Sequence, residues 1–418
     1  MKDTHRVVVL GAGFGGLTFC QAFRHPAAKI TLVDRTNHHL FQPLLYQVAT
    51  AGLSAPEIAA PVRALFSDRP DVTVLMDDVL SIDLAGRKVG IGHGVLDYDT
   101  LIIALGGVTS YFGHPEWEQH APGLKTLDDA LRIRRDVLLA LERAENESDP
   151  WRRTELMTLV VVGGGPTGVE LAGAFAELTR TVLARDFRRM DPTRARVVLV
   201  EAGERVLAHL SPELSASAQR QLEALGVEVR TSTRVQDVRE REVVLHGGES
   251  LRAANIIWAA GVAANPLSRV LGAETDRSGR IRVEPDLSLP GHQEVFAIGD
   301  IALVKDGQGG LVPGVSPAAM QMARHVAALL RNQLDAGAGL SPDRPAFRYW
   351  DKGTMATIGR SAAVAKVGSL ELSGLPAWLA WLLVHLVFLI GFRNRLAVLL
   401  QWAYSYFTYK RGARIIVS

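Results

Sequence analysis

The chain has 418 residues, of which 48% are hydrophobic and 22% are charged. This length allows two or three domains with large buried cores, and the composition excludes a disordered chain and a nucleic-acid-binding chain. The formal net charge is +2, but five basic residues and no acidic residue follow Glu371, so residues 1–371 alone carry −3.

The first expected element is a short β-branched strand at residues 7–10 that leads into the turn Gly11-Ala12-Gly13-Phe14-Gly15-Gly16. No long apolar segment precedes the strand, so we expect no secretory signal and folding in the cytoplasm. Glycines at this spacing let the backbone approach a pyrophosphate, which then rests on the positive end of the next helix. Asp34 ends the next expected strand, where a carboxylate accepts hydrogen bonds from a ribose. The pattern predicts a dinucleotide site.

The cysteine count limits the redox chemistry. Cys20 is the single cysteine of the chain, so it forms no internal disulfide and is expected to be a small core residue. This excludes chemistry that resembles glutathione reductase, thioredoxin reductase or sulfide:quinone reductase. The histidines form no HxxxH pattern, and the adjacent His38 and His39 would point in two directions, so no metal site is predicted.

A second fingerprint occurs in the middle of the chain. A polar stretch at residues 124–153 is typical of a surface helix and linker. The expected strand at residues 159–162 then leads into Gly163-Gly164-Gly165-Pro166-Thr167-Gly168, and Glu201 follows the expected strand 196–200. A carboxylate there would repel a 2′-phosphate, which favours NADH over NADPH. Two such sites imply two cofactors and electron transfer between them.

The order of the expected strands gives the domain organisation. The strand at residues 294–298, which is followed by Asp300, has no role in the second unit and is assigned to the first domain. The predicted fold is α/β with two Rossmann-like dinucleotide-binding domains and a C-terminal helical region that associates with a membrane. We expect a first domain from residues 1–115 and 286–350, a second from 155–285, and a C-terminal region at 351–418. The charge run at 180–196 is expected to be a solvated insertion.

The last 45 residues differ in character from the rest. Residues 374–392 carry no charge and are long enough for a transmembrane candidate, but Arg393 and Arg395 follow at once. The next segment is amphipathic, with one face formed by Leu396, Leu399, Leu400, Ala403 and Phe407. Two helices lying along a membrane surface fit best, with the aromatic and basic residues at the headgroups. A core hairpin, a dimer interface and a single span are the alternatives.

Further motifs are residues 296–300, residues 351–356, the aromatic tail and the block Asn37-His38-His39-Leu40-Phe41-Gln42-Pro43-Leu44-Leu45-Tyr46-Gln47-Val48-Ala49. Together with the two fingerprints, these motifs resemble those of a known family, the type II NADH dehydrogenases, which are single-subunit, non-pumping NADH:quinone oxidoreductases with FAD. The resemblance covers nearly the whole chain.

The resemblance implies the following site residues. Non-covalent FAD would be held by Gly11, Gly13, Phe14, Gly15, Gly16, Asp34, Val79, Gly106, Asp300 and Ala319. NADH would be held by Gly163, Gly165, Thr167, Gly168, Glu170, Glu201 and Gly261. Glu170 would position NADH and influence proton movement, as an alternative to a carboxylate that only stabilises a helix N-terminus. Glu177, two turns further on, is expected at the surface.

The expected quinone site departs from the family. The family carries an Ala-Gln pair where this chain has Ser316-Pro317, so the first glutamine is absent and the proline removes an N–H donor. Gln321 would remain as a catalytic amide beside the quinone, with Pro317 and Lys352 nearby.

The resemblance implies hydride transfer from NADH to FAD and two-electron reduction of a membrane quinone, without proton pumping. The enzyme would attach to the cytoplasmic face of the inner membrane, through the lipid surface alone or as a homodimer. Removing residues 374–418 is expected to spare NADH oxidation by soluble dyes. The alternatives are a reductase of a soluble acceptor and a non-enzymatic NADH-sensing flavoprotein.

Overall fold

The structure is a computed structural model that describes residues 4–307, 310–336, 344–408 and 412–416. The chain divides into two compact units, and each unit is built from three separated segments. Unit 1 consists of Met1–His39, Ala60–Val108 and Val262–Lys352, and unit 2 of Leu40–Ala59, Thr109–Gly261 and Gly353–Ser418. In this division, residues 40–59 and the C-terminal residues 353–418 belong to unit 2.

Unit 1 is built on a six-stranded sheet in the order β20-β21-β9-β1-β2-β5. Its strands are β1 (His5–Leu10), β2 (Ala28–Asp34), β5 (Val72–Met76), β9 (Thr100–Ile103), β20 (Ser288–Leu289) and β21 (His292–Ala297). All neighbours are parallel except β20 and β21. The strand that follows the second fingerprint in sequence, β21, lies beside β9 in this sheet. The central strands are almost continuously apolar and buried, as parallel strands covered on both faces must be.

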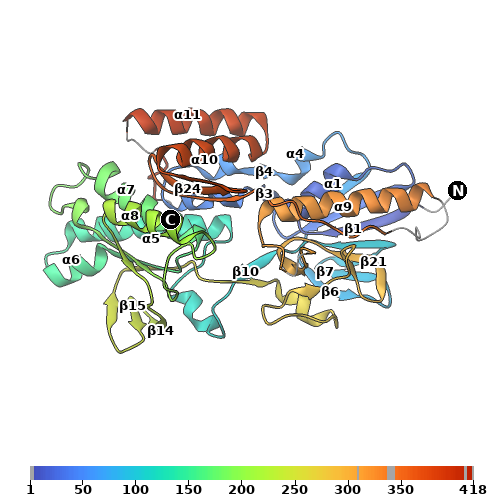
Figure 1. Ribbon diagram of the computed structural model, residues 1–418, viewed down its shortest axis with the longest axis horizontal. Coiled ribbons are helices and arrows are strands. Elements are labelled where there is room, and N and C mark those ends of the chain that lie inside the picture. The colour runs from blue at the N-terminus through green and yellow to red at the C-terminus, as the bar shows by residue number, and fades with distance from the viewer. Residues whose placement is uncertain (1–3, 308–309, 337–343, 409–411, 417–418) are drawn as a thin grey trace. The chain divides into compact units, whose positions relative to one another are not determined.

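Two helices of unit 1 pack against each other on this sheet, α1 (Phe14–Ala22) and α9 (Ser316–Asp335) (Figure 1). Smaller elements complete the unit: α4 (Val62–Leu65), β6 (Val79–Asp83), β7 (Lys88–Ile91), β8 (Gly94–Asp97), β18 (Val262–Ala264), η5 (Pro266–Val270), β19 (Ile281–Arg282), η6 (Gly299–Ile301) and β22 (Ala302–Leu303). Three short strands lie where the chain passes between units: β3 (His38–Leu40), β4 (Ala59–Pro61) and β10 (Gly107–Thr109).

Unit 2 repeats the scheme with a parallel four-stranded sheet in the order β13-β12-β11-β17. These strands are β11 (Thr158–Val162), β12 (Arg196–Val200), β13 (Val227–Arg230) and β17 (Asn255–Trp258). Two antiparallel sheets accompany it. One contains β14 (Val235–Arg239), β15 (Glu242–Leu245) and β16 (Ser250–Arg252), and the other β23 (Thr354–Gly359), β24 (Ala362–Val367) and β25 (Leu370–Ser373). The predicted α/β class with two Rossmann-like units is confirmed.

The longest helix of unit 2 is α5 (Leu127–Asn146), which begins at a capping box formed by Thr126 and Asp129. It occupies most of the polar stretch that was expected to be a surface helix. The other helices are η1 (Gln42–Leu44), α2 (Leu45–Ala49), α3 (Ala55–Ile58), η2 (Pro115–Gln119), α6 (Pro150–Leu156), α7 (Pro166–Glu177), η3 (Leu178–Val182), η4 (Pro192–Arg194), α8 (Pro212–Ala224), α10 (Leu375–Phe388) and α11 (Phe392–Thr408).

The C-terminal segment forms two helices, α10 and α11, which pack against each other (red in Figure 1). Fourteen residues make α10 about 21 Å long, which is shorter than the roughly 30 Å of a bilayer's hydrocarbon core. Among the described helices, none is both long and apolar enough to cross a membrane. The tail residues Lys410 and Arg411 lie outside the described residues.

The helix that follows the second fingerprint, α7, is fixed to β23 by a close backbone contact. A Cβ atom at Gly173 would lie 1.6 Å from the carbonyl oxygen of Ile358, so no side chain fits there. At the end of the helix, Glu177 accepts a hydrogen bond from the backbone N–H of Arg360. The expectation that Glu177 is a surface residue is therefore wrong, because its carboxylate joins the helix to the turn between β23 and β24.

Replacing Gly173 by alanine is expected to destabilise unit 2 by about 3 kcal/mol, because the new methyl group must displace the backbone of α7 from that of β23 at Ile358. Thermal unfolding of the two proteins measures this. Gly412→Ala is the matched control, since a Cβ at Gly412 meets nothing within 4 Å. Equal unfolding temperatures for Gly173→Ala and the unchanged protein would contradict the close contact.

Candidate functional site

The first fingerprint, in unit 1, forms a glycine-rich turn between β1 and α1. Gly11 has a φ of +99°, and a Cβ on Gly16 would lie 1.8 Å from the Gly11 carbonyl oxygen, so both positions require glycine. A Cβ on Gly13 would meet nothing within 4 Å. The N-terminal turn of α1 carries no acidic residue. Gly13 and the helix end therefore leave room and a favourable dipole for a pyrophosphate.

The acid at the end of β2 is tied to this turn. The Asp34 carboxylate accepts the backbone N–H of Ala12 at 2.6 Å, and its other oxygen accepts the N–H and hydroxyl of Thr36, each at 2.7 Å. A carboxylate has about four acceptor positions, so a ribose can still bind. Asp34 thus shapes the glycine turn as well as offering a ribose ligand.

The second fingerprint, in unit 2, has the same construction. Gly163 has a φ of +113°, a Cβ on Gly168 would lie 1.8 Å from the Gly163 carbonyl oxygen, and Gly165 faces open space. The Glu201 carboxylate accepts the backbone N–H groups of Gly164 and Gly203, each at 2.5 Å. Thr167 is exposed in the first turn of α7.

Other predicted cofactor residues of unit 1 surround the ends of its strands. Gly106, just beyond β9, has a φ of +65° and open space at its Cβ position. Val79 begins β6, directly after the segment that extends β5. Among the described residues, none donates a hydrogen bond to the carboxylate of the half-buried Asp300. The Cβ of Ala319 lies beside Gly299, next to Asp300. In unit 2, Gly261 has a φ of +81° and is exposed.

The N–H of Ala319 is engaged within α9, since it donates to the carbonyl oxygen of Val315 at 3.2 Å. The N-terminal end of α9 would therefore stabilise an anionic flavin ring chiefly through the helix dipole. Pro317 occupies the second position of the helix, where an N–H group has no partner within the helix. The missing N–H of Pro317 thus leaves the hydrogen bonding of α9 intact.

The side chain of Gln321 is also engaged. Its amide nitrogen donates to the carbonyl oxygen of Trp350 and its oxygen accepts the N–H of the same residue, both at 3.0 Å. The ammonium of Lys352 lies 5.3 Å from the ring centre of the exposed Trp350. Gln321 therefore fixes the segment before residue 353 to α9, and a quinone would have to share or displace this amide.

Glu170 lies in the second turn of α7, and protein atoms enclose its carboxyl group although the residue keeps some accessible surface. Burial raises its pKa to about 8. The backbone N–H of Thr357 and the indole N–H of Trp381 oppose this shift, because both favour the ionised form. Neither N–H meets the geometry of a regular hydrogen bond to the carboxyl. At neutral pH the carboxyl is mostly protonated.

The sequence reasoning missed the surroundings of this carboxyl. Trp381 is 1% exposed and belongs to α10, for which attachment to a membrane surface was the favoured interpretation. On the same helix, Ala377 is buried with Ala363 and Ala365 in an apolar cluster. One signal was present, because Ala377, Trp381 and His385 are spaced by four residues and so share a face of the helix.

The outward faces of the two C-terminal helices are apolar and exposed. Leu383 is 64% exposed on α10, and Leu400 and Phe407 are 60% and 80% exposed on α11. This confirms that the predicted amphipathic set of α11 shares an exposed face. The patch is larger than the scattered apolar residues of an ordinary surface.

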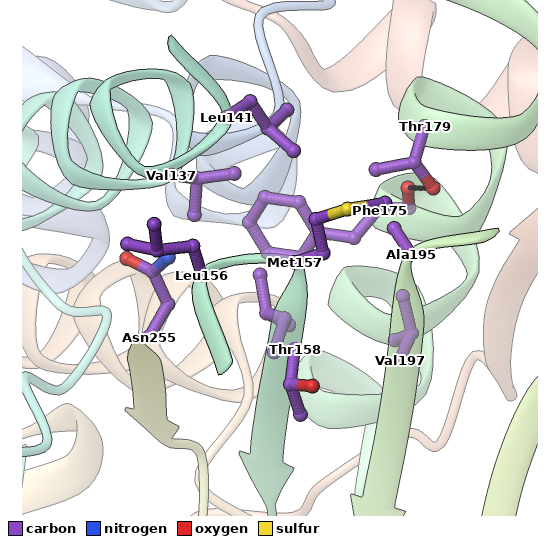
Figure 2. A pocket seen from close by; sticks show the side chains of 11 residues that line it. Val137, Leu141, Leu156, Met157, Thr158, Phe175, Thr179, Ala195, Val197 and Asn255 are labelled. Atoms are coloured by element: carbon purple, nitrogen blue, oxygen red, sulfur yellow. Dashed lines mark hydrogen bonds between the residues drawn. The ribbon is translucent and has the colours of Figure 1, made fainter. Parts of the chain in front are cut away.

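A small pocket of unit 2 is not part of these sites (Figure 2). Helix α5 contributes Val137 and Leu141 to it, and the ring of Phe175 from α7 lies at its centre. The hydroxyl of Thr179 is turned toward the Phe175 carbonyl oxygen at 3.0 Å. The wall is therefore almost wholly apolar and offers nothing to a nucleotide.

The polar groups at these sites indicate which cofactors they can bind. Two bare glycine turns, each with an acid at the end of the second strand, suit two nucleotide cofactors, and the unpaired Asp300 suits the hydroxyls of the flavin side chain. Within the described ranges, no group of three or more His, Cys, Asp or Glu side chains could hold a metal ion. Cys20 is buried and free, as predicted.

Comparisons with known proteins identify the family of the chain. The family model described as pyridine nucleotide-disulphide oxidoreductase matches residues 5–326, and the NDH2 C-terminal domain matches residues 351–410. The type II NADH:quinone oxidoreductase Ndh of Mycobacterium tuberculosis is 44% identical over 98% of this chain and 89% of its own. The demethylphylloquinone reductase NdbB of Synechocystis is 31% identical over 95% of each chain.

A solved structure shows the same fold. NDH2 from Plasmodium falciparum in complex with NADH superposes with a TM-score of 0.90 at 19% identity, over 99% of this chain and 100% of that one. By its family model and its 44% identical relatives, the chain belongs to the pyridine nucleotide-disulphide oxidoreductases and, within them, to the FAD-dependent type II NADH:quinone oxidoreductases.

Proposed function

We propose that this chain reduces a quinone at a membrane surface and that Glu170 supplies a proton to the reaction. The observation that supports this role is the enclosed Glu170 carboxyl on α7, the helix that starts at the NADH fingerprint. Bound FAD supplies the two-electron chemistry between NADH and the quinone. The protein supplies binding, orientation and protons.

The binding roles follow from the two glycine turns. The turns at Gly13 and Gly165 hold the two pyrophosphates, while Asp34 and Glu201 hold the riboses. Since Glu201 presents a carboxylate where NADPH carries a phosphate, it favours NADH.

A quinone takes up two protons for every two electrons, so its reduction requires a proton donor. A carboxyl with a pKa of about 8 is protonated at neutral pH and can release a proton without a large free-energy change. As the pH rises through this value the protonated fraction falls, and the reaction slows. Glu170 should therefore set the alkaline limb of the activity profile.

We further propose that α10 and α11 attach the enzyme to the cytoplasmic face of the inner membrane. Their exposed leucines and Phe407 would enter the lipid, while Arg393 and Arg395 attract anionic headgroups by about 1 kcal/mol each. This surface explains how a quinone, whose tail stays in lipid, reaches the protein. The alternative partner of this face is a second copy of the chain, which would bind it in a homodimer.

Glu170→Gln is expected to lower quinone turnover about 100-fold and to remove the alkaline limb, because the amide cannot donate and regain a proton. Reduction of the bound flavin by NADH, measured as the loss of flavin absorbance, should persist. Glu177→Gln, on the same helix, still accepts the Arg360 N–H through its amide oxygen and serves as control. Unchanged turnover and pH profile in Glu170→Gln would contradict the proton-donating role.

Leu383→Glu combined with Leu400→Glu is expected to weaken binding to anionic liposomes by at least about 100-fold, because each buried leucine contributes roughly 1.5–3 kcal/mol. Co-sedimentation with the liposomes measures binding, and turnover with a water-soluble quinone should be unchanged. Val270→Glu, an exposed apolar position outside the two helices, is the control. Unchanged liposome binding together with loss of a dimer in sedimentation would assign the face to self-association.

A further inference from the structure

The inward face of α10 carries a buried indole whose N–H group has no regular hydrogen-bond partner among the described residues. Trp381 is 1% exposed, and its Nε1 is sealed from solvent. Its ring stacks on His385 at 4.1 Å between centroids and lies 5.5 Å from Trp402 and 6.4 Å from Tyr46. A buried N–H is costly unless a polar group faces it. The polar group beside this one is the Glu170 carboxyl.

The placement of Trp381 is fixed from several sides. Ala377, one helical turn earlier, is packed against Ala363 and Ala365 of β24. His385, one turn later, bonds the Trp381 carbonyl oxygen at 2.8 Å through its Nδ1. The indole can therefore neither swing away nor turn its N–H toward water.

The opposite partner is equally constrained. Gly173 brings α7 against the backbone of β23 at Ile358, three residues beyond Glu170. The neighbouring Thr357 directs its N–H toward the same carboxyl. Two N–H groups from the C-terminal segment thus converge on one side chain of the nucleotide-binding helix.

We propose that Trp381 is a positioning residue whose buried indole N–H orients the Glu170 carboxyl. The helix that offers its outer face to lipid thereby completes the proton-donating site with its inner face. This inference rests on the proposed function of Glu170 as proton donor.

The other titratable groups around Glu170 have partners of their own. The Tyr46 hydroxyl of α2 accepts from Gln47 at 2.8 Å, and burial lowers the pKa of His385 to about 4, so this imidazole is neutral. Glu177 of α7 is bonded to the backbone of Arg360, and the Arg360 guanidinium lies over Tyr406. The indole N–H and the Thr357 N–H therefore remain as the groups that favour ionisation of Glu170.

The assignment also changes what is expected when the tail is removed. Deleting residues 374–418 would strip Trp381 from Glu170 and uncover the β24 alanines, so the deletion cannot separate membrane attachment from catalysis. Point variants on the inner and outer faces of α10 can separate the two functions.

The test compares the full-length FAD-loaded protein, Trp381→Phe and Trp378→Phe by infrared titration. The protonated carboxyl band of Glu170 is identified by its absence in Glu170→Gln. Trp378 lies on the same helix and packs on Tyr406 at 5.5 Å, so its replacement removes a different indole. Trp381→Phe is expected to raise the titration midpoint by about one pH unit, because the ionised form loses a donor. The alkaline limb of turnover with a soluble quinone should move upward equally.

A midpoint in Trp381→Phe equal to that of the unchanged protein, or lower, would overturn the inference. If Trp381→Phe fails to fold, replacing the indole by benzothiophene keeps the shape, removes only the N–H and must give the same upward shift. The two proposals fail separately. If the midpoint shifts in Trp381→Phe but Glu170→Gln keeps full quinone turnover, the positioning role stands and proton donation is rejected. If the midpoint does not shift in Trp381→Phe but Glu170→Gln loses quinone turnover, proton donation stands and the positioning role is rejected.

Discussion

The constraint on which unit 2 depends is a carboxyl group that is enclosed by protein and has no cationic neighbour among the described residues. Desolvation disfavours the charged form of Glu170, and the two N–H groups near it offset only part of that effect. The folded pKa of about 8 lies above the ordinary value of 4.5, so the folded unit binds more protons than the unfolded chain between these values. Unit 2 therefore loses stability as the pH rises through this window. The packing of α7, β23 and α10 must compensate.

The two nucleotide turns use one device twice. In each, a carboxylate from the end of the second strand accepts a backbone N–H of the glycine turn, from Ala12 in unit 1 and from Gly164 in unit 2. The acids thus hold the turns in shape before any ribose arrives. Preorganisation of this kind reduces the ordering entropy that binding would otherwise have to offset.

Local patterns in the sequence predicted the strands, the glycine turns and their acids, because these depend on neighbours within about 35 residues. The strand order also indicated that β21 returns to the first sheet. The amphipathic set of α11 was readable because its period is helical. These features are short-range or periodic, and both kinds of information are present in a single sequence.

Contacts over long sequence distances were not predictable in this way. Glu177 meets Arg360, and Trp381 meets Glu170, across about 200 residues, and the sequence gives no register for such pairs. Gln321 was assigned to the quinone from its position in a family motif, but the amide is occupied by the Trp350 backbone. The apolar stretch of α10 indicated a helix lying along a membrane surface, but it did not identify Ala377 and Trp381 as the residues buried against protein.

The segmented construction of unit 2 has a consequence for biosynthesis. Its third segment, Gly353–Ser418, is synthesised only after residues 262–352, which belong to the other unit. The parallel sheet and α7 emerge long before β23 and α10 can cover them, so the nascent unit carries exposed apolar surface throughout synthesis of residues 262–352. Contacts between such distant segments slow folding and favour aggregation of partly folded chains. Unit 2 can therefore be completed only once Gly353–Ser418 has been synthesised, and chaperones that hold the unfinished unit should influence its yield.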